Sequence, residues 1–470
     1  MITTLERLFA LQRAAFAHER YPDLATRRDR LARLGALVMD NEKRFVDAVN
    51  QDFGHRSAHE TRLAELYIVS SGIRHAQAQL ARWMKPERVA MPLHLKPARA
   101  RIERQPLGVA GIISPWNYPV QLALSPAMGA LAAGNRVLLK PSEMTPATSA
   151  LLQELIAARF REDEFAVVLG DPRVGQAFSA LPFDHLFFTG STAVGRRVAL
   201  AAANHLTPVT LELGGKSPAL FDTDVDWSAA ALRLIAGKLL NAGQTCIAPD
   251  YALVPAAQVD AFVAAVTTAT SKLYPTFGGN PDYTSIVNPR HYQRLTGLID
   301  DARAKGARIV TLGSAADMPD AVSRILPPTL IVGANATMAV MQEEIFGPLL
   351  PIEAYGTLDE AIARIDARPR PLAFYYFGND GARRGRTLRE TIAGGVTVND
   401  TLWHFAHEEL PFGGVGASGI GAYHGEASFL TFTHRKPVFT QPRLTAAGLL
   451  RPPYGAAFEK VLALLKRMNG

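Results

Sequence analysis

From Leu107 onward, short apolar runs of strand length alternate with helical stretches, and this alternation constrains the fold more than any other feature. Up to residue 212 the runs are 107–113, 136–140, 166–169, 185–189 and 207–212, with helical segments such as 121–135 and 192–204 between them. Strands and helices that alternate in this way form crossover units on a parallel sheet. We therefore predict an α/β fold whose ligands bind at the carboxyl ends of its strands.

A second alternating region begins after Gly214 and Gly215. Its predicted strands are 217–221, 250–254, 307–312, 349–355, 372–377 and 395–399, and its helices include 227–240. Residues 1–84 predict helices with one apolar face. The segment 85–105 contains three prolines and fits neither region, so we predict a hairpin extension there. The end of the chain predicts an amphipathic helix that docks on protein.

Composition narrows the class of protein. A chain of 470 residues, of which 48% are hydrophobic, can bury the cores of two or three domains. Its net charge of +7 comes from basic residues scattered among acidic ones, so we expect no nucleic-acid partner. The first residues lack the apolar core of a signal peptide, and no stretch is apolar enough to span a membrane. With a single cysteine, the chain is expected in a reducing compartment, the cytoplasm.

That single cysteine, Cys246, lies in the turn that follows the predicted helix 227–240. A lone cysteine is most often an inert buried residue. Its neighbours Gly243, Gln244 and Thr245 favour an accessible thiol instead. A deprotonated thiol can add to a carbonyl carbon, but a pKa of about 8.5 leaves little thiolate at neutral pH without help.

Two further residues at predicted strand ends could assist such a thiol. Glu212 ends the run 207–212, where burial raises the pKa of a carboxyl group and makes it a stronger base. Taken alone it fits a structural role equally well. Asn117 lies between Pro115 and Pro119 after the run 107–113. It can present an amide N–H to a developing oxyanion, or it can serve as a plain turn residue.

Other segments suggest a nucleotide site. The run from Phe188 to Gly195 leads from a strand into a helix, whose N-terminus can bind phosphate, although its GxxxxG spacing is a weak signal alone. Lys140 and Glu143 follow another strand and could hold ribose hydroxyls. Glu344 and Phe346 would suit a nicotinamide ribose and ring.

Two segments are less informative. His404, His407 and Glu408 do not match the spacing of known zinc motifs, so we predict no metal. The glycine-rich segment 410–419 lacks a clear strand before it, and we expect it to pass close to the mouth of the site rather than to bind phosphate.

Seven of these segments, in the same order, resemble motifs of the aldehyde dehydrogenase superfamily. They are Pro115–Pro119, Lys140–Glu143, Phe188–Ser191, Leu211–Lys216, Gly243–Cys246, Glu344–Pro348 and Pro411–Gly414. The resemblance runs from about residue 30 to 440. The segments 243–251 and 421–425 resemble the class 3 branch, and 52–57 and 280–285 are most similar to coniferyl aldehyde dehydrogenases within it.

The resemblance implies a mechanism and a set of ligands. Cys246 attacks the aldehyde, Asn117 and the Cys246 N–H stabilise the oxyanion, and Glu212 activates the water that hydrolyses the thioester. The implied substrate is an aromatic aldehyde such as coniferyl aldehyde, or a medium-chain aliphatic one. The cofactor is NAD, with NADP as the alternative. The expected cofactor contacts are Trp116, Lys140, Glu143, Gly190, Ser191, Gly195, Glu344 and Phe346.

The resemblance also implies an organisation. We expect a Rossmann-like NAD(P)-binding domain (1–84 and 106–211), an α/β catalytic domain (212–410), bridging and oligomerisation elements (85–105 and 411–445) and a helical tail (446–470). A homodimer follows from the resemblance alone. Three alternatives stay open at this point: a relative that passes the thioester to coenzyme A, a non-catalytic binding protein with the same fold, and a cysteine hydrolase that uses Cys246.

Overall fold

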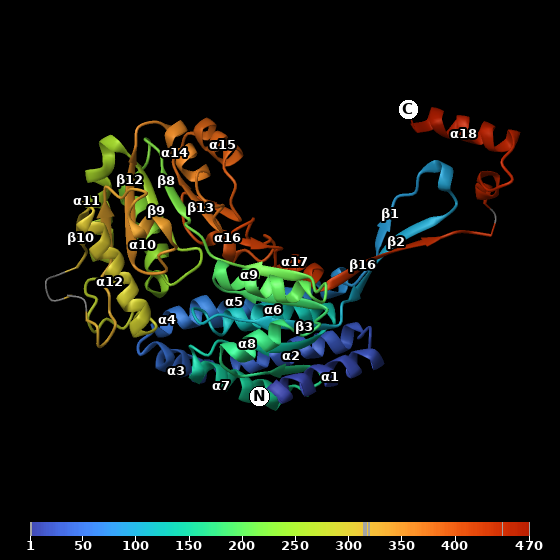
Figure 1. Ribbon diagram of the computed structural model, residues 1–470, viewed down its shortest axis with the longest axis horizontal. Helices are drawn as coiled ribbons and strands as arrows, with labels where there is room; N and C mark the ends of the chain where they lie inside the picture. The colour runs from blue at the N-terminus through green and yellow to red at the C-terminus, as the bar shows by residue number, and fades with distance from the viewer. Residues whose placement is uncertain (1, 314–316, 318–319, 444, 470) are drawn as a thin grey trace.

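The computed structural model describes the whole chain except residues 1, 314–316, 318–319, 444 and 470. It contains two α/β bodies, each built on its own sheet, and an arm that projects from one of them (Figure 1). The predicted α/β class is confirmed, and parallel pairs dominate both large sheets.

The first body holds a six-stranded sheet in the order β15-β7-β6-β3-β4-β5. Its strands are β3 (Val109–Ile113), β4 (Arg136–Lys140), β5 (Phe165–Val167), β6 (His185–Thr189), β7 (Val209–Glu212) and β15 (Gly419–Ile420). All neighbours are parallel except β15, which pairs antiparallel with β7. Five of these strands lie where the apolar runs predicted them, because most of their residues are buried in a sheet covered on both faces.

Helices cover both faces of this sheet. On one face lie α1 (Ile2–His18), α8 (Pro172–Ser179) and α9 (Thr192–Ala203), which share an apolar cluster with the strands. The elements of the other face are α2 (Leu24–Met39), α3 (Glu42–Phe53), α4 (Ala58–Thr61), the π-helical turn η1 (Arg62–Tyr67), α5 (Ile68–Trp83), α6 (Gln121–Ala133), α7 (Pro146–Arg159) and α17 (Gly425–Thr431). β15 and α17 thus belong to this body, although they lie within the segment 411–445 that we assigned to bridging elements.

The strand order reverses between β3 and β6. From β3 the chain adds β4 and β5 on one side, then crosses back to add β6 and β7 on the other. The connections on the two sides of such a switch point leave in opposite directions and open a crevice at the carboxyl ends of the strands. This crevice is where an α/β sheet of this kind binds its ligand.

The second body holds a seven-stranded sheet in the order β10-β11-β12-β9-β8-β13-β14. The strands are β8 (Pro218–Phe221), β9 (Tyr251–Pro255), β10 (Arg308–Thr311), β11 (Thr329–Val332), β12 (Leu349–Tyr355), β13 (Ala373–Phe377) and β14 (Gly395–Val398). The sequence prediction missed β11, a four-residue strand directly after two prolines. Around the sheet lie α10 (Trp227–Leu239), η3 (Leu240–Gly243), η4 (Ala256–Gln258), α11 (Val259–Leu273), α12 (Pro289–Ala304), α13 (Ala339–Gln342), α14 (Leu358–Asp366), α15 (Gly381–Glu390) and α16 (Trp403–Ala406).

The arm confirms the predicted hairpin. β1 (Glu87–Val89) pairs antiparallel with β2 (Arg99–Pro106), with the turn η2 (Leu93–Leu95) between them, and β2 pairs with β16 (Thr433–Thr440). The tail, η5 (Ala446–Leu450) and α18 (Ala456–Asn469), lies beyond the arm, away from both large sheets (Figure 1). We expected the terminal helix to dock on protein. In the described residues α18 does not dock on either α/β body of its own chain (Figure 1). Within the part of the chain that the structure describes, no helix is long and apolar enough to cross a membrane.

Candidate active site

Four of the predicted motifs meet along one edge of the six-stranded sheet. Asn117, Lys140, Gly190 and Glu212 all lie at or just after the carboxyl ends of neighbouring strands. Backbone bonds tie these ends together: Ser114 donates to the Lys140 carbonyl over 3.1 Å, and Gly190 donates to the Glu212 carbonyl over 3.0 Å. The edge includes the switch point between β3 and β6, where a ligand crevice is expected.

Cys246 reaches this edge from the second body through an unusual turn. After α10, Asn241 and Ala242 adopt left-handed backbone angles, with φ of 54° and 52°, which strain residues other than glycine. Gly243 follows with φ of 75° and packs directly against the Gly347 carbonyl, so a Cβ atom has no room there. The chain is thus bent sharply just before the cysteine, which leaves the thiol half-buried at a cavity wall.

The side chain of Gln244 stabilises the turn before Cys246 through hydrogen bonds to the backbone. Its buried side-chain amide donates to the Asn241 carbonyl at 3.0 Å and to the Ser285 carbonyl at 3.1 Å. Its Oε1 accepts from the Val287 N–H at 2.9 Å. A side chain whose hydrogen bonds are all made to backbone fixes the path of the loop that carries Cys246. Sequence reasoning noted Gln244 only as a neighbour of the thiol.

Asn117 is linked to the same turn. Its Nδ2 donates to the Gln244 carbonyl at 3.2 Å, and its own carbonyl accepts from Asn241 Nδ2 at 2.9 Å. An amide nitrogen carries two hydrogens, so one remains for a ligand. Asn117 and the Cys246 loop, which come from different bodies, are therefore held in register by direct bonds.

A buried ion pair supports Asn117 from behind. Arg56 and Glu65 lie 3.1 Å apart, and both side chains are 0% exposed. Arg56 donates to the Asn117 carbonyl at 2.9 Å, and Glu65 accepts from the Val120 N–H at 2.7 Å. A third buried side chain, Glu60, accepts from the Asn241 N–H at 3.0 Å. Sequence reasoning gave none of the three a role: Arg56 lies in the segment 52–57, which was noted only for its resemblance, and Glu60 and Glu65 lie on helical turns outside the motifs.

Glu212 is buried, and neither of its carboxyl oxygens has a hydrogen-bond partner among the described residues. Burial therefore raises the pKa of Glu212 well above its ordinary value. Burial also raises the pKa of the Cys246 thiol, and the nearby carboxylates of Glu344 and Glu212 raise it further. The buried hydroxyl of Tyr423 lies close enough for Glu212 and Cys246 to raise its pKa further. A buried acid with free oxygens beside a thiol can take a proton from a small molecule bound between them.

The segments predicted to bind a nucleotide lie at the ends of β4 and β6. Lys140 Nζ lies 2.5 Å from Glu143 Oε2, and Ser191 caps α9 by accepting from the Val194 N–H. A Cβ atom on Gly195 would lie 2.5 Å from Leu213, so the start of α9 packs closely on the sheet edge. The free N–H groups of that helix end attract phosphate.

Glu344 and Phe346 come to the same edge from the second body. Glu344 packs directly against Gly214, and burial raises its pKa to about 8. The Phe346 ring meets the Trp116 ring edge-on, with centroids 5.4 Å apart. Lys216 holds this segment through a bond to the Val340 carbonyl at 2.8 Å and an ion pair with Asp250. The residues expected to contact a nicotinamide half thus converge beside Cys246.

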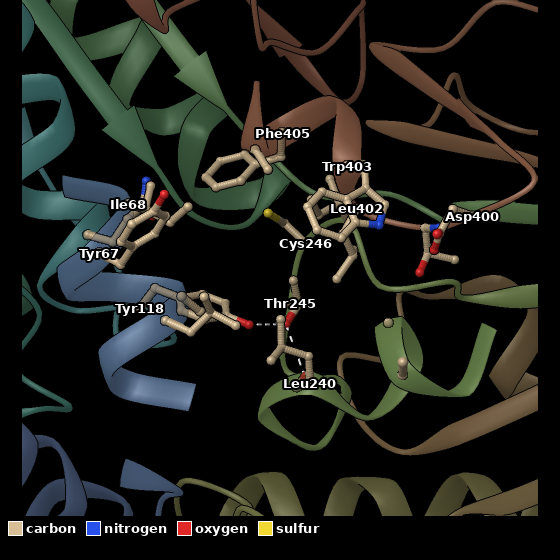
Figure 2. Close-up of a pocket in the computed structure, with 18 of the residues that line it drawn as sticks. Tyr67, Ile68, Tyr118, Leu240, Thr245, Cys246, Asp400, Leu402, Trp403 and Phe405 are labelled. Atoms are coloured by element: carbon tan, nitrogen blue, oxygen red, sulfur yellow. Dashed lines mark hydrogen bonds between the residues drawn. The ribbon is translucent and has the colours of Figure 1, made fainter. Parts of the chain in front are cut away.

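A cavity of about 460 Å³ opens on the other side of Cys246. Figure 2 shows its aromatic and aliphatic wall, to which Tyr118, Leu402, Trp403 and Phe405 contribute. The Tyr118 hydroxyl bonds to Thr245 Oγ1 at 2.7 Å and so fixes that wall to the cysteine loop. A cavity of this size with a thiol in its wall can hold a small apolar molecule against the sulfur.

Comparison with known proteins agrees with this geometry. Residues 4–438 match the description "Aldehyde dehydrogenase family". The chain belongs to the aldehyde dehydrogenase family. A probable coniferyl aldehyde dehydrogenase of Pseudomonas aeruginosa is 51% identical over 461 residues, which are 98% of this chain and 96% of the relative.

Two solved structures are also similar. The substrate-bound state of Staphylococcus aureus AldH has a TM-score of 0.94 at 40% identity, over 98% of this chain and 99% of that one. AldC of Pseudomonas syringae, in complex with NAD+ and octanal, has a TM-score of 0.83 at 28% identity, over 93% of this chain and 89% of that one. The resemblance noted in the motifs is confirmed, and the chain is an NAD(P)-dependent aldehyde dehydrogenase.

The segment 400–406 lines the cavity, a role that the sequence analysis did not consider. We weighed His404 only as a metal ligand, whereas its neighbours Leu402, Trp403 and Phe405 line the cavity of this aldehyde dehydrogenase. His404 itself is buried, bonds to Thr397 at 2.8 Å, and has a pKa lowered to about 4 by burial. Its place is structural. The aromatic residues beside it were the signal that could have indicated a wall.

Proposed function

We propose that the enzyme oxidises an aromatic aldehyde such as coniferyl aldehyde, or a medium-chain aliphatic one, to its acid through a thioester on Cys246. The observation that carries this proposal is a half-buried thiol in the wall of an apolar cavity, near a buried Glu212 whose carboxyl oxygens have no hydrogen-bond partner in the described part of the chain. Relatives that are 48–51% identical are named coniferyl or probable coniferyl aldehyde dehydrogenase, which supports the aromatic substrate.

In the first half of the reaction, the Cys246 sulfur forms a bond to the aldehyde carbon. Because burial and nearby carboxylates raise its pKa, the thiol starts protonated, and its proton leaves to solvent water as the bond forms. The free Nδ2 hydrogen of Asn117 and the Cys246 N–H stabilise the negative carbonyl oxygen. Bound NAD(P)+ supplies the acceptor for the hydride that leaves the same carbon.

In the second half, Glu212 acts as the base for hydrolysis. In its ionised form it takes a proton from a water molecule, whose oxygen attacks the thioester carbon. The bond from carbon to Cys246 sulfur breaks, the acid leaves, and the sulfur regains a proton. The absence of competing hydrogen bonds on Glu212 leaves both of its oxygens available for that water.

The cofactor contacts follow from the same edge. We propose that Gly190, Ser191 and Gly195 hold the pyrophosphate, that Lys140 and Glu143 hold the adenine ribose, and that Glu344, Phe346 and Trp116 hold the nicotinamide half. The fit rests on the close packing at the start of α9 and on the paired Lys140 and Glu143. A carboxylate at position 143 repels a 2′-phosphate, so NAD is favoured over NADP.

The organisation of the chain is part of the proposal. We retain the NAD(P)-binding domain at 1–84 and 106–211, the catalytic domain at 212–410 and the arm as an oligomerisation element. The exposed antiparallel edge of the arm supports association into a homodimer, because unpaired strand edges favour pairing. A cytoplasmic location remains the expectation from the single unpaired cysteine.

Modification of the single cysteine tests the proposed chemistry directly. Iodoacetamide should label one site per chain, Cys246, and abolish NADH formation from an aldehyde. Prior incubation with aldehyde and NAD should slow the labelling, since the sulfur is then in use. Intact mass measures the label and absorbance of NADH measures activity. Full activity after stoichiometric labelling would remove Cys246 from the mechanism, and NADH release itself separates this proposal from a hydrolase or a non-catalytic protein.

A further inference from the structure

An ion pair lies at the outer part of the cavity. Among the described residues that line it, Arg233 and Asp400 are the two whose side chains are charged when free in water at neutral pH. Arg233 comes from α10, and Asp400 follows β14. Their side chains are 49% and 32% exposed. Seen from Cys246, Asp400 lies beyond Leu402 and Trp403 (Figure 2).

The two charges do not satisfy each other. Arg233 Nε and Asp400 Oδ2 lie 3.9 Å apart, too far for a hydrogen bond. Arg233 Nη1 donates to the Asn399 carbonyl at 2.6 Å, and Asp400 Oδ1 accepts from the Thr401 N–H at 2.7 Å. These bonds hold both side chains in place and leave Asp400 Oδ2 and the Arg233 Nε–H free toward a ligand.

Stability does not account for this pair. Exposed ion pairs at this distance contribute little to the free energy of folding. Because the rest of the cavity wall is mostly apolar, the two charged groups instead favour a substrate that carries a polar group at this position. A hydroxyl group placed between the two charges can donate to Asp400 and accept from Arg233, and such charge-assisted bonds are stronger than neutral ones. An apolar group at the same place would strip water from both charges without compensation.

We propose that Arg233 and Asp400 determine specificity: they select aldehydes that carry a hydroxyl group at the end remote from the aldehyde, and phenols above all. This inference rests on the proposed function, because the aldehyde must lie at Cys246 for its far end to reach the pair. The aromatic side chains between the two ends, Trp403 and Phe405, suit the ring of such a substrate.

We expect only a moderate preference in kcat/KM for an aldehyde with the remote hydroxyl group over an analogue without it. A site that buries its hydrogen-bonding groups can reject an analogue without the hydroxyl by roughly 10⁴-fold or more. Arg233 and Asp400 are partly exposed, so water replaces part of the lost bond. We therefore expect a ratio of about three- to ten-fold in kcat/KM, scaled down from the value for one hydrogen bond to a charged group.

Three substrates with one skeleton test the proposal: 4-hydroxycinnamaldehyde, 4-methoxycinnamaldehyde and cinnamaldehyde. Their acid products are measured by chromatography, with NAD as cofactor. The wild-type enzyme should prefer the hydroxy compound to the methoxy compound, which cannot donate. Asp400→Ala and Arg233→Met should each bring this ratio towards one, through a loss of kcat/KM for the hydroxy compound. Asp300→Ala, which removes an exposed carboxylate on α12 outside the cavity, should keep the wild-type ratio.

Each other result has a distinct meaning. A ratio that survives both Asp400→Ala and Arg233→Met overturns the proposal. An equal fall for all three substrates in both variants also overturns it, because the pair would then support the loop rather than select the substrate. If the wild-type enzyme forms no acid from any of the three aldehydes and none from an aliphatic aldehyde, the proposed function is wrong. The present inference is then wrong as well.

Discussion

Replacing Glu212 with glutamine separates the two halves of the proposed reaction. Glu212→Gln keeps the size and shape of the side chain but removes its ability to take a proton from water. Because both carboxyl oxygens of Glu212 lack partners, the substitution breaks no hydrogen bond within the described chain. General base catalysis typically contributes about 10²- to 10⁴-fold, so steady-state turnover should fall by that factor. Hydride transfer to the first equivalent of NAD should survive, because solvent water takes the thiol proton.

The same substitution should not destabilise the fold. Burial raises the pKa of Glu212 above the value of about 4.3 that an unfolded chain gives it. The contribution of Glu212 to the free energy of unfolding is therefore greatest below its pKa in the unfolded chain. It declines as pH rises through the folded pKa, because ionisation of the buried carboxyl group is unfavourable. Glutamine does not ionise. Glu212→Gln should therefore match the wild-type free energy of unfolding near pH 4 and exceed it at alkaline pH, by about 1.4 kcal/mol for each tenfold change in the dissociation constant.

Stopped-flow absorbance and intact mass measure the catalytic prediction, and denaturant unfolding at two pH values measures the stability prediction. The expected signature is a burst of NADH near one per active site, followed by very slow turnover and an acyl group retained on Cys246. Glu390→Gln, on the exposed end of α15, is the matched control and should turn over normally. A lost burst would assign Glu212 to deprotonation of Cys246 instead. Turnover near the wild-type rate would contradict both roles and remove Glu212 from the catalytic set.

Three further predictions follow from the same geometry. The KM for NAD should be lower than that for NADP, and Glu143→Gln should narrow the difference because it removes the charge that repels a 2′-phosphate; initial rates with each cofactor measure this. Arg56→Met leaves the buried Glu65 carboxylate unpaired, which should lower the free energy of unfolding by about 3–5 kcal/mol in denaturant titrations, with partial recovery in Arg56→Lys. Gly243→Ala places a Cβ atom against the Gly347 carbonyl at φ of 75° and should lower thermal stability and slow Cys246 labelling together. Unchanged unfolding of Arg56→Met, or unchanged labelling of Gly243→Ala, would contradict these assignments.

The sequence could predict the strands and the edge on which the motifs lie, because both depend on short-range patterns. Runs such as 136–140 and 185–189 are buried on both faces and carry a continuous apolar signal. β11 has only four residues between a proline pair and a glycine, so its signal is too short to separate it from a loop. The α/β fold class could therefore be predicted from the sequence, whereas the number and order of the strands could be determined only from the structure.

The supports of the site could not be predicted in the same way. Arg56 and Glu65 look like ordinary charged residues, one in a loop and one on a helical turn, and only the packed fold shows that they are buried and bonded behind Asn117. Arg233 and Asp400 lie 167 positions apart and meet only when the seven-stranded sheet forms. Motifs identify residues that contact the reacting atoms, whereas positioning and selection depend on contacts between distant segments.

The strained backbone around the site explains why those distant contacts are needed. Asn241, Ala242, Phe346, Leu402 and His424 all have positive φ, a conformation that costs residues other than glycine of order 1–3 kcal/mol each. They lie in the loops that carry the thiol, the ring proposed to contact nicotinamide, the cavity wall and the buried tyrosine. Such conformations persist only where the surroundings hold them. The bonds that reach these loops from the first body therefore do more than add stability, because they keep the nucleophile and the oxyanion donor in one arrangement before a substrate arrives.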